Sequence, residues 1–142
     1  MALSVSGFDP SLDYKIIYQS VAVNSANVDV AQGPCSLISA VIDNGSGTAD
    51  CFLKLFDGDS ATVGTSIPNL IFRCKQETAQ RFEVPEGVSF TNLSFWVTRN
   101  AADLDNTVPT VSGGNVLVTL VVKPSCPWPS LRAQRLPLWR ER

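Results

Sequence analysis

The fold class is decided by residues 35–56, which read CSLISAVIDNGSGTADCFLKLF. Two short apolar stretches, Cys35–Asp43 and Asp50–Phe56, flank the turn Asn44-Gly45-Ser46-Gly47, whose glycines can adopt positive φ. Short apolar stretches on both sides of a glycine-containing turn are typical of an antiparallel β-hairpin. We therefore predict that these two stretches are strands that pair through a short loop.

Similar stretches rich in Val, Ile, Phe and Leu recur along the chain with turn residues between them, and helix signals are nearly absent. In the clearest case Leu70, Phe72 and Cys74 alternate with polar residues, which indicates a strand with one wet face. The pattern predicts an all-β fold, an antiparallel β-sandwich. The predicted strands are Lys15–Val23, Cys35–Asp43, Asp50–Phe56, Asn69–Lys75, Gln80–Val84, Val88–Val97 and Asn115–Lys123, with a short edge piece near Val28.

The 142 residues, 44% of them apolar, suit one domain with extended N- and C-terminal arms. We assign 1–13 to an N-terminal arm, 14–123 to the sandwich and 124–142 to a tail rich in Pro, Trp and Arg. Within the sandwich, the irregular segment Asn100–Gly114 is predicted to be an exposed connection at one end. The apolar runs are too short to span a membrane, and no charged-then-apolar leader opens the chain, so we expect neither membrane insertion nor secretion.

Charge is divided unevenly along the chain. Residues 1–124 carry seven basic and twelve acidic side chains, whereas residues 125–142 carry four arginines and a single glutamate. An acidic body is repelled by nucleic-acid phosphates, and four arginines are few compared with dedicated nucleic-acid binders. We therefore expect no nucleic-acid partner.

The absence of histidine excludes Ser-His-Asp triads, Cys-His pairs and imidazole metal sites. Four cysteines, at positions 35, 51, 74 and 126, are too widely spaced for a zinc knuckle, so we predict packed thiols; a disulfide between neighbouring strands, for instance Cys35 with Cys51, stays open. We expect no metal and no cofactor.

Candidate catalytic groups are few. The carboxylate pairs Asp57 with Asp59 and Asp103 with Asp105 lie in connections where aspartate commonly shapes the turn, and we predict that role for them. Lys54 stands between two leucines, and strand alternation predicts that it points away from them into solvent. No nucleophile can be nominated, so we predict a protein without enzymatic activity and name no catalytic residue.

Several segments in order resemble a known family. They are Leu53-Lys54-Leu55-Phe56-Asp57, 63–70 (VGTSIPNL), 82–90 (FEVPEGVSF), Val97-Thr98 with Ala101-Ala102-Asp103, and the alternation Val116, Val118, Leu120. This order, over roughly residues 21–123, resembles small virion proteins of tailed bacteriophages. The resemblance implies a jelly-roll-like β-sandwich on the outer surface of the capsid, a decoration or cement protein, commonly a homotrimer, whose partner is the major capsid protein. The tail after Lys123 departs from the family pattern.

Two functions therefore compete. The first is a capsid decoration protein that stabilises a phage head by non-covalent contacts between neighbouring subunits. The second is a receptor- or carbohydrate-binding sandwich of a phage fibre or tail accessory, which needs an exposed aromatic residue in a cleft. Trp96 discriminates between them, because an exposed Trp96 can stack on a sugar or pack in a subunit interface, whereas core burial removes it from both roles. We expect burial.

The C-terminal tail is the predicted interaction site. Its prolines block ladder hydrogen bonds, and its tryptophans need cover from water. We expect it to contact neighbouring subunits. The predicted anchors are Trp128, Leu131, Arg132, Arg135, Leu138, Trp139 and Arg140.

Overall fold

A computed structural model of the chain describes residues 4–5, 14–21 and 25–124. Within these ranges the chain forms strands and no helix, so no helix there can cross a membrane, and the predicted all-β class is confirmed. The strands are β1 (Ser4–Val5), β2 (Lys15–Val21), β3 (Cys35–Asp43), β4 (Cys51–Asp57), β5 (Leu70–Cys74), β6 (Ala79–Phe90), β7 (Leu93–Thr98) and β8 (Val116–Pro124).

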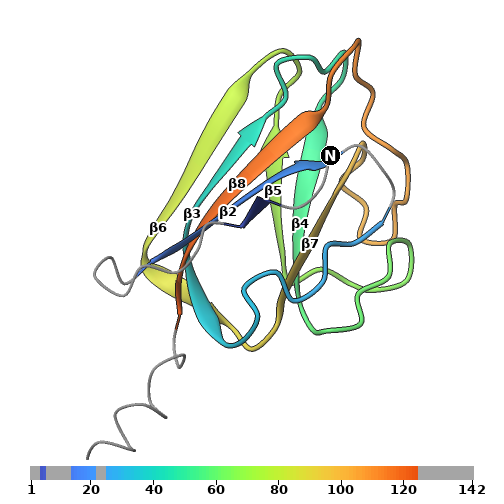
Figure 1. The fold of residues 1–142 in the computed structure, drawn as a ribbon. Helices are drawn as coiled ribbons and strands as arrows, with labels where there is room; N and C mark the ends of the chain where they lie inside the picture. Colours follow the sequence, from blue (N-terminus) through green and yellow to red (C-terminus); the bar gives the residue numbers. More distant parts are fainter. Residues whose placement is uncertain (1–3, 6–13, 22–24, 125–142) are drawn as a thin grey trace, which may run out of the picture.

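The strands form two antiparallel sheets that face each other (Figure 1). The first has five strands in the order β1-β2-β8-β3-β6, and the second has three in the order β5-β4-β7. Their inner faces share one core, because alternate residues of β3, β4, β7 and β8 are fully buried. The core residues are Ile17, Val30, Cys35, Leu37, Ala40, Ile42, Cys51, Leu53, Leu55, Cys74, Phe90, Leu93, Phe95, Val97, Val116, Val118, Leu120 and Val122.

The hairpin predicted from residues 35–56 is wrong. β3 pairs with β6 and β8, whereas β4 pairs with β5 and β7, so the two strands belong to different sheets. The buried Asn44 holds the connection in its crossing path, because its Nδ2 donates to Ala49 O at 2.9 Å and to Lys75 O at 3.2 Å. A glycine turn marks where the chain changes direction, and the side-chain contacts beyond it decide which sheet the chain enters.

β6 also differs from the prediction. The sequence placed a break between Gln80–Val84 and Val88–Val97, but β6 runs unbroken through that point and the chain turns at 91–92 instead. In the register with β3, Leu37 lies opposite Val88 and Ser39 opposite Glu83. The four residues 84–87 therefore face Ile38 alone, which makes a bulge larger than the usual two residues opposite one.

The two ends of the chain are described in part. Ser4 and Val5, which the sequence placed in an irregular arm, form the edge strand β1 and pair with β2. Near the predicted edge piece at Val28, Asn27 forms an isolated bridge with Phe95. The tail anchors from Trp128 to Arg140 lie outside the described residues.

Candidate functional site

The outer face of the three-stranded sheet is closed by the chain's own loops. Ser94, Trp96 and Thr98 lie on this face of β7 and are all buried. The Ser94 hydroxyl accepts from Asp29 N at 3.0 Å and donates to Gly58 O at 2.6 Å, which attaches two loops to the strand. This face therefore offers no open surface at β7.

Lys54 is buried beneath the loop between β7 and β8, which corrects the predicted solvent exposure. It does point away from Leu53 and Leu55, but its relative exposure is 0%, and its Nζ donates to Ala102 O. Alternation along a strand decides which face a side chain takes, and it does not say whether a loop covers that face. The segment Asn100–Gly114 is an irregular and mostly exposed connection, as predicted, and near Ala102 it also covers Lys54 on the outer face of the sheet.

The buried amine has an altered acidity. Burial lowers the pKa of the Lys54 ammonium, and the nearby carboxylates of Asp105 and Asp103 raise it in part. Asp105 also organises the covering loop, since its carboxylate accepts from Asn100 N at 3.1 Å and from Thr107 Oγ1 at 2.8 Å. These hydrogen bonds hold the pKa of Asp105 below its usual range against the opposing effect of its burial. The lysine therefore anchors the loop.

Trp96 is fully buried, as expected, although it lies under loops on the outer face of the sheet and not between the sheets. It is next to Lys54 in the β4–β7 register, and its ring packs at a tilt against Phe56 with centroids 6.2 Å apart. Its Nε1 has no hydrogen-bond partner among the described residues. A buried ring cannot stack on a sugar, so Trp96 does not provide the exposed aromatic that a carbohydrate site needs.

The carboxylates and thiols of the described chain hold its loops and core. Asp57 Oδ1 accepts from Thr91 N and Asn92 N at 2.9 and 3.0 Å, so it holds the turn between β6 and β7 and not the turn of its own connection. Among the described residues, no group of three or more Cys, Asp or Glu side chains could hold a metal ion.

The three described cysteines are free and buried, as predicted, and no Cys35–Cys51 disulfide forms. Cys51 lies directly opposite Cys74 across β4 and β5. Its hydrogen bond to Cys74, together with burial, raises the pKa of Cys51. Burial also raises the pKa of Cys35, to about 11, and the fourth cysteine, Cys126, lies outside the described residues.

The outer face of the five-stranded sheet is apolar around β2, whereas on β6 it carries the exposed pair Arg81 and Glu83. Tyr14, Ile16 and Tyr18 are 43%, 45% and 37% exposed, and they follow one another on one side of β2. Ile16 lies opposite Val121 in the neighbouring β8. Exposed apolar side chains that adjoin one another on a sheet face are typical of a contact surface. We use the name open face for these three exposed side chains together with four half-buried apolar neighbours on the same sheet face, Ile38, Val41, Leu117 and Val121.

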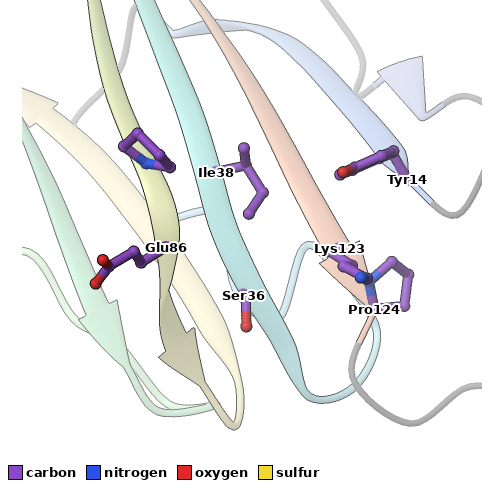
Figure 2. Close-up of a pocket in the computed structure, with 7 residues that line it drawn as sticks. Tyr14, Ser36, Ile38, Glu86, Lys123 and Pro124 are labelled. Atoms are coloured by element: carbon purple, nitrogen blue, oxygen red, sulfur yellow. The ribbon is translucent and has the colours of Figure 1, made fainter.

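A hollow of about 430 Å³ lies at one end of the open face, where the β6 bulge meets β3 (Figure 2). Ile38 lies between Tyr14 on one side and Glu86 on the other, with Lys123 and Pro124 close to the end of β8. Gly87 forms the turn of the bulge with φ of +78°, and a Cβ there would stand 3.1 Å from Ser36 Cβ. The hollow is lined by Tyr14, Ser36, Ile38, Pro85, Glu86, Lys123 and Pro124.

Sequence reasoning missed both the open face and the hollow. A signal was present in β2, where the consecutive residues Ile16 and Ile17 are apolar on opposite faces, as are Val121 and Val122 in β8. A strand that is apolar on both faces is buried on both or carries a contact surface.

Comparisons with family models, with curated proteins and with solved structures gave no match. The geometry described above, together with the order of sequence segments, therefore carries the functional conclusions that follow.

Proposed function

We propose that this protein is a structural virion protein that decorates the outside of a phage head and stabilises it through non-covalent contacts between neighbouring subunits. The observation that supports this most directly is the open face. The three-stranded sheet is covered by the chain's own loops, whereas the five-stranded sheet exposes Tyr14, Ile16 and Tyr18 side by side. Adjoining exposed apolar side chains often mark a protein–protein contact, and aromatic residues such as tyrosine are enriched in the core of such contacts.

The partners in this proposal are the major capsid protein and further copies of the chain, in a homotrimer on the outer capsid surface. The order of segments from Leu53 to Leu120 that resembles phage virion proteins supports that assignment, as does the two-sheet fold. Repeated over symmetry-related sites, modest apolar contacts add up to substantial stabilisation of a shell. The predicted tail anchors would extend the contact beyond the open face.

A receptor- or carbohydrate-binding function is not retained. That function needs an exposed aromatic residue to stack on a sugar, and Trp96, the residue considered for it, is buried. No other described observation favours it.

The test combines copy counting with one matched pair of variants. Purified particles should contain the protein in a fixed ratio to the major capsid protein. Ile16→Asp places a charge on the open face, and Ile67→Asp places the same charge at an apolar side chain that is 61% exposed in the loop before β5. We expect Ile16→Asp to fold and lose its place on particles, and Ile67→Asp to keep it. Absence of the protein from particles, or equal occupancy of both variants, overturns the proposal.

A further inference from the structure

The hollow beside the β6 bulge is built from two unusual backbone features. Ile38 is skipped in the register of β3 with both β6 and β8, so it is the unpaired residue of a bulge. Across from it, 84–87 loop out of the β6 ladder and bring Pro85 and Glu86 to the rim. Bulges occur preferentially where a strand re-aims a side chain for contact or catalysis. The hollow is therefore a formed feature of the open face, and its lining shows what it can hold.

The lining combines apolar surface with groups that suit an indole ring. Ile38, Pro85 and the Tyr14 ring provide apolar contact. The Glu86 carboxylate and the Ser36 hydroxyl can accept a hydrogen bond from an indole N–H, and the Lys123 ammonium can lie over an aromatic face. Within the described ranges none of these polar side chains makes a hydrogen bond or an ion pair. A tryptophan matches both parts of this lining.

The chain itself supplies a tryptophan at this place. Pro124, the last residue described, lines the hollow, and Trp128 follows four residues later. Four residues extend about 13 Å, which is enough to bring the indole back over the hollow that the chain has just left. Trp139 is fifteen residues from Pro124, so its tether spans up to about 50 Å and holds it near the hollow far less often.

Proline content favours the short tether further. Pro124, Pro127 and Pro129 each restrict φ, so docking a segment that contains them costs less conformational entropy than docking a segment without proline. Contact between an indole ring and the apolar lining of the hollow removes both surfaces from water, which is favourable.

We propose that Trp128 docks into the hollow of its own chain, over Ile38 and between Tyr14 and Glu86. This contact fixes the root of the C-terminal segment on the open face. It leaves residues 130–142, with Trp139, to reach other molecules. The inference goes beyond the proposed function and does not depend on it, because it concerns the isolated chain.

The two tyrosines of the chain provide an internal control for the test. Tyr14 lines the hollow, whereas Tyr18 lies on the same face outside it, and the two are similarly exposed. Hydroxyl-radical footprinting of the full-length protein, read by peptide mass spectrometry, gives the ratio of Tyr14 to Tyr18 modification. We expect Trp128→Ala to raise this ratio severalfold and the matched variant Trp139→Ala to leave it unchanged. Neither substitution changes a residue of the described sheets.

Three outcomes contradict the proposal. An equal ratio in the native chain and in Trp128→Ala shows that Trp128 does not cover Tyr14. An increase with Trp139→Ala alone assigns the hollow to the other tryptophan. A ratio in the native chain that rises on dilution shows that the covering segment comes from a second copy, whereas docking within one chain is independent of concentration. The particle assay of the proposed function uses neither tyrosine, so the two proposals can fail separately.

Discussion

The buried Lys54 leads to a prediction about stability that separates packing from charge. Its side chain is 0% exposed between β4 and the loop that carries Ala102, and its Nζ donates to the Ala102 carbonyl. Lys54→Ala removes three methylene groups, which at about 0.8 kcal/mol each contribute about 2.4 kcal/mol, before any cavity is counted. Lys54→Met keeps four of the five side-chain positions, with sulfur in place of the δ-methylene, and removes the ammonium.

The two variants should therefore behave differently. In Lys54→Met the lost hydrogen bond, worth about 1.5–3 kcal/mol, is offset by release of the ammonium from an unfavourable buried position, so we expect a free energy of unfolding within about 1.5 kcal/mol of the native protein. Lys54→Ala should be at least about 2.4 kcal/mol less stable than Lys54→Met. Burial disfavours the charged ammonium of Lys54 and so lowers its pKa, and removing that ammonium in Lys54→Met removes the same unfavourable free energy.

Urea unfolding followed by circular dichroism measures this difference. With a slope of about 2 kcal/mol per molar urea, the midpoint of Lys54→Ala should lie about 1 M below that of Lys54→Met. The control is Lys75→Ala, whose side chain is exposed, and its midpoint should stay at the native value. Equal midpoints for Lys54→Ala, Lys54→Met and the native protein would show that the lysine is solvated, and the reasoning about the covering loop would then be refuted.

Three further predictions concern Cys35, Asn44 and Gly87. Burial raises the pKa of Cys35 to about 11, so as the pH rises the unfolded chain loses the thiol proton before the folded protein does. The free energy of unfolding should therefore fall by up to about 2–3 kcal/mol between pH 9 and 11. In urea titrations at increasing pH, Cys35→Ala should show a smaller fall. Asn44→Ala leaves the Ala49 and Lys75 carbonyls without their amide donor, so the urea midpoint should drop by an amount equivalent to about 2–3 kcal/mol, and an unchanged midpoint would contradict the bridging role. Gly87→Ala forces a side chain into φ of +78° against Ser36, so calorimetry should show about 1–2 kcal/mol of destabilisation, whereas no loss would mean that the bulge relaxes freely.

The strands could be predicted from the sequence largely because their information is local. β3 begins and ends where the alternation of residues 35–43 predicted, and β4, β5 and β8 are shifted by at most one residue at either end. Each of these strands has one face in the core, and a period of two is enough to recognise that arrangement.

The partners of the strands could not be predicted in the same way. The turn at Asn44 to Gly47 has the composition of a hairpin, yet the chain crosses to the other sheet there. Asn44 at this crossing donates to the carbonyl of Lys75, 31 residues away, and no local sequence pattern contains such a contact. Between the predicted strands Gln80–Val84 and Val88–Val97, the residues Pro85 and Gly87 lie in a bulge inside one continuous strand.

The open face could not be predicted because the sequence does not show which sheet face is covered by loops. β4 carries Leu53, Lys54 and Leu55, and β2 carries Ile16 and Ile17, so each strand presents long side chains to both of its faces. In β4 the second face is covered by the loop at Ala102, and in the five-stranded sheet Ile16 remains 45% exposed. The sequence shows that a strand has long side chains on both faces. Only the fold shows whether a loop of the same chain covers the second face. At Ile16 no described loop covers the side chain. Our two proposals assign that contact to the chain's own C-terminal segment at the hollow and to a second protein along the rest of the open face.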